Sequence, residues 1–150
     1  MTAPHQTPHR VMQPTPSYSP PAEPWHRRLS WPLVVGLATF ALSRPLLSIT
    51  GLAEEWGKPA TPLVATAVIT LVWMVAAARF ARQAPVLTLV ATGLTYAGLA
   101  IVLSAVLSPV LDGQASPIVT NPFAVVGVLS TNAVWGLVAG GLAALLARAR

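Results

Sequence analysis

The sequence predicts an all-α membrane protein, a polytopic bundle of four transmembrane helices that follows a disordered N-terminal tail. Three observations support this fold class. Apolar residues make up 54% of the 150-residue chain and charged residues only 9%, a balance too apolar for an ordinary soluble domain. Four apolar stretches are each long enough to cross a bilayer of about 30 Å. The segment that precedes them is rich in proline and polar residues and has little apolar surface to bury.

Residues 1–28 are expected to form the disordered, proline-rich tail on the cytoplasmic side. The histidines His5, His9 and His26 lie on this proline-broken stretch without fixed geometry, which favours solvated side chains over a metal site. The tail ends in a collar of tryptophan and arginine residues at 25–31, which is typical of a helix that enters an anionic membrane face.

Residues 29–150 are expected to form the transmembrane domain, with spans near 31–53, 61–78, 85–111 and 122–147. Charges in the connecting segments orient these spans. One side carries a set of arginines, and the other carries the acids that follow the first and third spans. The arginines are Arg10, Arg27, Arg28, Arg79, Arg82, Arg148 and Arg150, opposite Glu54, Glu55, Lys58 and Asp112. The positive-inside rule then places both termini in the cytoplasm, and we expect a multi-pass protein of a plasma membrane.

Arg44, within the first span, is the residue around which the other spans are expected to assemble. An arginine inside a membrane must face protein or water. Pro45 follows it, and this proline predicts a kink that frees a backbone carbonyl one turn earlier, near Ala41. Counted from the outer ends, similar depths are reached by Thr70, Ser104 and Asn132. No carboxylate lies within any span, so we predict a polar layer in which Arg44 donates to Asn132, Ser104 or Thr70. Asp112, in the loop after the third span, is the acidic candidate if the chain folds back.

The fourth span carries a stripe of small residues that suits close helix packing. Asn132, Gly136, Gly140 and Ala144 recur every four residues, and the two glycines have the GxxxG spacing. Packing within the bundle is favoured over a homodimer interface. Threonines on the second and third spans are expected to bond their own backbone rather than line a polar path.

Four short motifs resemble a group of small four-span membrane proteins from high-GC Gram-positive bacteria. They are Leu-Ser-Arg-Pro-Leu-Leu-Ser at 42–48, Leu-Ser-Pro-Val-Leu at 107–111, Asn-Pro-Phe-Ala-Val at 121–125 and Asn-Ala-Val-Trp-Gly at 132–136. The resemblance covers most of residues 31–150. It implies the four-span architecture and no particular activity, ligand or partner.

For function, the sequence favours a structural or accessory subunit of a membrane complex, in contact with the lipid bilayer and with a protein partner or a second copy. The alternative is a small channel or transporter for an anion or acidic solute that uses Arg44. Small multidrug exporters need a carboxylate in the first span, where this chain has Arg44, and the Thr/Phe/Ser-rich motif of four-span fluoride channels is missing from the third span. With no cysteine and no catalytic constellation, we expect no enzyme, cofactor, metal or nucleic-acid partner.

Overall fold

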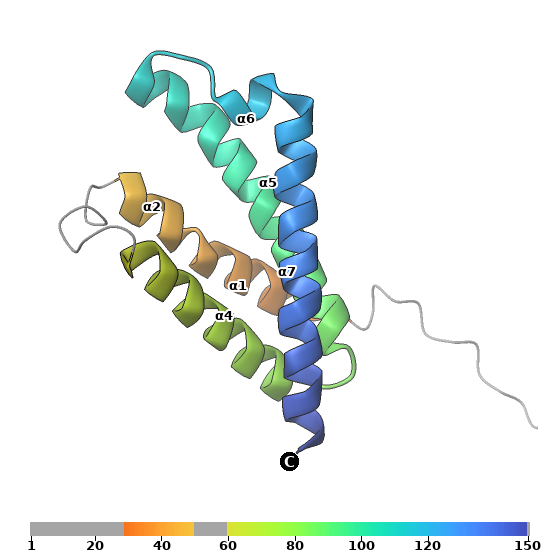
Figure 1. The fold of residues 1–150 in the computed structure, drawn as a ribbon. Coiled ribbons are helices and arrows are strands. Elements are labelled where there is room, and N and C mark those ends of the chain that lie inside the picture. Colours follow the sequence, from red (N-terminus) through yellow and green to blue (C-terminus); the bar gives the residue numbers. More distant parts are fainter. Residues whose placement is uncertain (1–28, 50–59, 150) are drawn as a thin grey trace, which may run out of the picture.

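The computed structural model describes residues 29–49 and 60–149, and this part of the chain is helical with no β-strand (Figure 1). The all-helical prediction is therefore confirmed for the described residues. The elements, in chain order, are α1 (Trp31–Ala41), α2 (Ser43–Ile49), α4 (Ala60–Phe80), α5 (Pro85–Asp112), α6 (Pro117–Thr120) and α7 (Pro122–Arg148). The predicted tail, and Glu54, Glu55 and Lys58, lie outside the described residues.

Three helices, α4, α5 and α7, are long and apolar enough to cross a membrane, which identifies a membrane protein. Their surfaces agree with that environment, because large apolar side chains such as Phe123 (85% exposed) and Val110 (79% exposed) face outward. In a bilayer such side chains contact acyl chains. The predicted spans at 61–78, 85–111 and 122–147 differ from the observed helices by at most two residues at either end.

The first predicted span differs from the other three. Its apolar helical part, Trp31–Leu46, is shorter than a membrane-crossing helix, and it is broken at Leu42 between α1 and α2. The break lies one turn before Pro45, which has no N–H to bond the carbonyl of Ala41. The predicted kink is therefore seen, whereas a continuous helix over 31–53 is not, and residues 50–53 lie outside the described part.

The bundle is packed tightly in only one half. We call the closed half the end that contains the α4–α5 connection and the C-terminal end of α7, and the open half the end that contains α2 and α6 (Figure 1). Among the described residues, the last buried one on α5 is Ala97. Apart from the cap Ser116, the next buried residue along the chain is Gly136 on α7. The core thus lies in the closed half, and the outermost turns of α5 and α7 enclose little.

Glycines set how closely α5 and α7 approach in the closed half. A Cβ on Gly136 would lie 2.5 Å from the carbonyl oxygen of Leu89, and one on Gly140 would lie 2.6 Å from the Cα of Val86. Gly93 meets the backbone of Asn132 in the same way. Any larger side chain at these three positions would push the helices apart, so the glycines are what allows the backbones to touch.

The short helix α6 was not expected from the sequence and closes the connection between α5 and α7. Ser116 caps it, accepting a hydrogen bond from the backbone N–H of Ile118 at 3.3 Å, and is buried. The Ser116 hydroxyl also bonds that of Ser104 on α5 at 2.7 Å. This pair of hydroxyls fastens α6 to α5 at the top of the open half.

Candidate functional site

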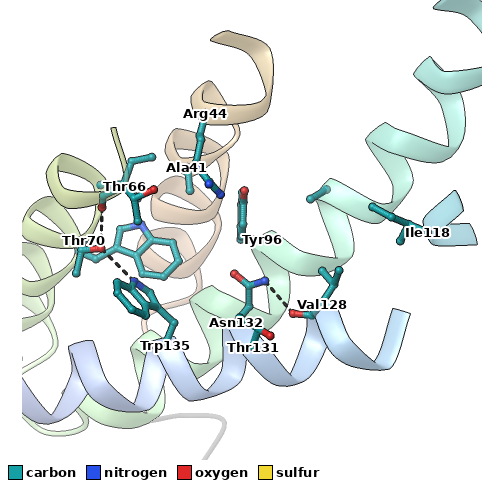
Figure 2. Close-up of a pocket in the computed structure, with 13 residues that line it drawn as sticks. Ala41, Arg44, Thr66, Thr70, Tyr96, Ile118, Val128, Thr131, Asn132 and Trp135 are labelled. Carbon is teal, nitrogen blue, oxygen red and sulfur yellow. Dashed lines mark hydrogen bonds between the residues drawn. The ribbon is translucent and has the colours of Figure 1, made fainter. Parts of the chain in front are cut away.

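A cavity of about 450 Å³ occupies the space between the helices where the open half begins (Figure 2). This volume falls within the range of small-molecule sites. All six described helices contribute to its wall. The lining residues are Ala41, Arg44, Thr66, Ile69, Thr70, Trp73, Tyr96, Ala100, Ile118, Val128, Thr131, Asn132 and Trp135.

Two helical stripes form the facing walls of the cavity. On α4 the lining residues are at 66, 69, 70 and 73, and on α7 they are at 128, 131, 132 and 135. Both sets follow the i, i+3, i+4, i+7 spacing of a single helix face, and both end in tryptophan. The cavity is therefore built from whole helix faces rather than from loops.

Trp73 and Tyr96 form the aromatic side of the cavity. Trp73 is 3% exposed and donates its indole N–H to the carbonyl of Leu37 on α1 at 3.1 Å. The Tyr96 ring meets it edge to face, with centroids 6.5 Å apart at 77°. The bond from Trp73 to Leu37 ties α4 to α1.

Arg44 brings a positive charge to this cavity. It lies on α2, is exposed, and extends toward Tyr96 in Figure 2. None of the described residues that line the cavity is acidic. Within the described part of the chain, no hydrogen bond or ion pair engages the guanidinium, whose five N–H groups are available to a ligand. The side chain of Asp112, the acidic candidate, lies outside the described residues.

The predicted polar layer is assembled only in part. Thr70 and Asn132 line the cavity with Arg44, whereas Ser104 does not and instead bonds Ser116. Thr70 donates to the carbonyl of Thr66 at 2.7 Å, and Asn132 donates to that of Val128 at 2.8 Å. The layer is therefore a set of polar groups around one space, without the direct Arg44 hydrogen bonds that the sequence suggested.

The predicted packing stripe lies below the cavity and belongs to the bundle itself. Gly136 and Gly140 are buried against α5, which agrees with packing within one chain. Ala144 is only half-buried, and the adjacent Ala143 is fully buried in its place. The contact face therefore turns from an i, i+4 row to the set Gly136, Ala139, Gly140 and Ala143.

Sequence reasoning missed three contributors to the site: Tyr96, Trp135 and Ile118. Trp135 donates its indole N–H to the Thr70 hydroxyl at 3.1 Å and so joins α7 to α4 across the cavity. Its spacing of three residues from Asn132 places both on one helix face, and this signal could have identified it. Ile118 reaches the cavity only because α6 folds inward, for which the sequence offered no signal.

Among the described residues, no group of three or more histidine, cysteine or acidic side chains is arranged to hold a metal ion. The chain matches no protein-family model, and neither a curated protein nor a solved structure is similar to it. The class of protein is thus defined by its helices, and any more specific role is argued from the cavity alone.

Proposed function

We propose that this chain is a non-enzymatic accessory protein of a bacterial plasma membrane, and that it holds an acidic group in the Arg44 cavity. The observation that carries the proposal is a cation on the wall of a largely apolar cavity, with no acid among the described lining residues. An arginine at membrane depth is retained when it has a counter-charge or a path to water. Because no described lining residue supplies a counter-charge, we infer that another molecule does, such as a partner protein, a lipid or a solute.

Other lining groups support an anion in this position. The second N–H of the Asn132 amide and the hydroxyls of Tyr96 and Thr131 are free of hydrogen bonds to the described residues and can donate to an oxyanion beside Arg44. Charge-assisted hydrogen bonds of this kind are about twice as strong as neutral ones. Trp73, by contrast, already uses its single N–H within the bundle.

The test is to extract the tagged full-length chain gently into lipid nanodiscs and to measure the mass and composition of what copurifies. A stoichiometric protein or lipid that is lost in the Arg44→Gln variant supports the accessory role. Arg82→Gln is the matched control, because Arg82 is an exposed arginine at the opposite end of the bundle. A monomer with the same composition in all three preparations contradicts the proposal.

A second candidate, transport of an anion or acidic solute, is favoured by the position of the cavity between helices that can cross a membrane. Liposomes that contain the full-length chain should then release acidic solutes faster than empty liposomes, and Arg44→Gln should abolish the difference. Equal release from both kinds of liposome excludes this candidate.

The orientation proposed for the membrane has its own test. Arg79, Arg82 and Arg148 are all exposed at the closed end, which supports placing that end in the cytoplasm. Because the chain has no cysteine, single cysteines report accessibility cleanly. A membrane-impermeant thiol reagent added from outside should label Gln114→Cys and miss Gln83→Cys. The reverse pattern contradicts the orientation.

A further inference from the structure

A second cavity, of about 360 Å³, adjoins the Arg44 cavity between α4 and Trp135 of α7. Its wall is mostly aliphatic and carries no charge. The residues that line it are Leu63, Thr66, Ala67, Thr70, Leu71, Met74 and Trp135. Leu63 and Leu71 are 67% and 58% exposed, so this cavity opens on the apolar surface that contacts the bilayer.

The two cavities share one wall, which consists of Thr66, Thr70 and Trp135. Both threonines bond their own backbone, Thr66 to the carbonyl of Pro62 at 2.8 Å and Thr70 to that of Thr66. The only bond that crosses between helices at this wall, among the described residues, runs from the Trp135 indole to the Thr70 hydroxyl. Trp135 is 46% exposed, so the part of the shared wall that α7 contributes is a single side chain that its neighbours do not enclose.

We propose that the two cavities together bind an anionic amphiphile, with its acidic head beside Arg44 and its aliphatic tail in the cavity along α4. This inference rests on the proposed function and names the acidic group as a carboxylate or phosphate that carries a hydrocarbon chain. The head meets the cation and the donors of Asn132 and Tyr96, and the tail meets leucine, alanine and methionine side chains. Trp135 lies between them and covers the junction of head and tail.

The division of chemistry between the cavities is the reason for an amphiphile. A free inorganic anion would use the first cavity and leave the aliphatic one unexplained, because the latter offers only hydroxyls that are already bonded. A neutral lipid would fill the aliphatic cavity and leave the Arg44 guanidinium without a counter-charge. A molecule with one acidic group and one chain satisfies both, and the bilayer supplies such molecules at the open side of α4.

The binding test uses the purified full-length chain and four probes: oleate, hexanoate, oleyl alcohol and inorganic phosphate. Native mass spectrometry counts bound probe. Oleate should bind at least tenfold more tightly than each of the other three. Arg44→Gln should lower oleate affinity at least tenfold, while Arg82→Gln leaves it unchanged. Either of two results overturns the proposal. One is equal affinity for oleate and oleyl alcohol, and the other is displacement of oleate by phosphate as effectively as by hexanoate.

A second variant tests the tail site without touching the cation. Ala67→Leu adds bulk to the aliphatic cavity at an exposed position and is not expected to disturb folding. It should weaken oleate binding several-fold and leave hexanoate binding unchanged. Ala105→Leu, on a half-buried position of α5 that lines neither cavity, is the matched control. If both variants bind oleate as the unaltered chain does, the tail does not occupy this cavity.

Tryptophan fluorescence locates the junction. Fatty acids brominated near the carboxyl end should quench emission more than those brominated near the methyl end, and the difference should become smaller in Trp135→Phe, where Trp73 in the wall of the Arg44 cavity still responds. The amphiphile test and the nanodisc test also fail in different ways. A protein partner that depends on Arg44, without Arg44-dependent oleate binding, retains the accessory role and overturns the amphiphile. If the Arg44→Gln variant keeps both its oleate binding and its partner, the accessory role and the amphiphile are both overturned.

Discussion

The closed and open halves of this bundle are formed by the same helices, but the helices pack tightly in the closed half and loosely in the open half. In the closed half, glycines and alanines bring the α5 and α7 backbones together, and large side chains such as Trp73 and Leu89 are buried. In the open half, Gly98 and Gly127 on the same two helices meet no atom within 4 Å of a Cβ position, so the helices do not touch there. The difference indicates that stability comes from the closed half and that the open half is available for a ligand or partner.

The transition between the halves falls at one level of the bundle. On α7, the backbone of Asn132 touches α5 at Gly93 while its side chain lines the cavity, and Gly136, one turn later, touches α5 at Leu89 and does not line the cavity. On α4, Thr70 lines the cavity and Ala77 is fully buried two turns later. A change from small to polar side chains on the same helix face is enough to convert a packed seam into a site.

The largest effect expected in the comparison is that of Trp73→Ala. Trp73 is almost fully buried and ties α4 to α1 through Leu37, so its truncation leaves a void and removes the hydrogen bond between the two helices. We expect a loss of about 3–5 kcal/mol in the free energy of unfolding. The measurement is reversible unfolding by SDS in bicelles. Trp135→Ala, in the open half, should lose less than half as much, and an equal loss would break the comparison.

The glycine seam should respond next. Gly136→Ala places a methyl group 2.5 Å from the Leu89 carbonyl oxygen, and overpacking of this kind costs about 1–3 kcal/mol. Gly127→Ala, on the same helix in the open half, meets no atom within 4 Å. That control should leave stability unchanged or raise it by up to about 1 kcal/mol, because alanine favours a helix over glycine. The same unfolding assay should therefore show a loss of stability for Gly136→Ala and none for Gly127→Ala.

Removing the hydrogen bonds that hold α6 to α5 should have an intermediate effect on stability. Ser116→Ala removes both the cap of α6 and the partner of the Ser104 hydroxyl, for an expected loss of about 1–2 kcal/mol. Thr120→Val, at an exposed position of the same short helix, should change stability by less than about 0.5 kcal/mol. Proteolysis at the α5–α7 connection should increase only in the first variant. Similar rates for both would show that the two hydroxyls do not hold α6.

Arg44→Gln should have the smallest effect on stability. Arg44 is exposed and has no hydrogen bond within the described part of the chain, so we expect a change below about 0.5 kcal/mol in bicelles without added anionic lipid. The same variant should lose its bound acidic ligand. A loss of stability as large as that of Gly136→Ala would instead make Arg44 part of the packing of the bundle.

The helices were predictable because their signal is local. A run of apolar residues and its flanking arginines are readable without any partner, and the three long helices lie close to their expected positions. The break before Pro45 was also predictable, since a missing N–H acts within one turn. The glycine spacing indicated a close contact between helices, but it did not indicate that the contacting helix would be α5.

The sequence by itself determined that the chain is helical, that three of its helices suit a membrane, and that Arg44 and a small-residue stripe are the unusual features. Only the tertiary structure decided which polar residues meet. Ser104 and Tyr96 lie on the same helix about two turns apart, so a count from the outer ends of the spans selected Ser104 and passed over Tyr96, because such a count ignores how the helices tilt and shift against one another. The rotation of each helix is fixed by contacts such as Gly136 with Leu89 and Trp73 with Leu37, which join residues far apart in the chain. Those contacts turn Tyr96, Asn132 and Trp135 toward Arg44 and leave Ser104 to bond Ser116.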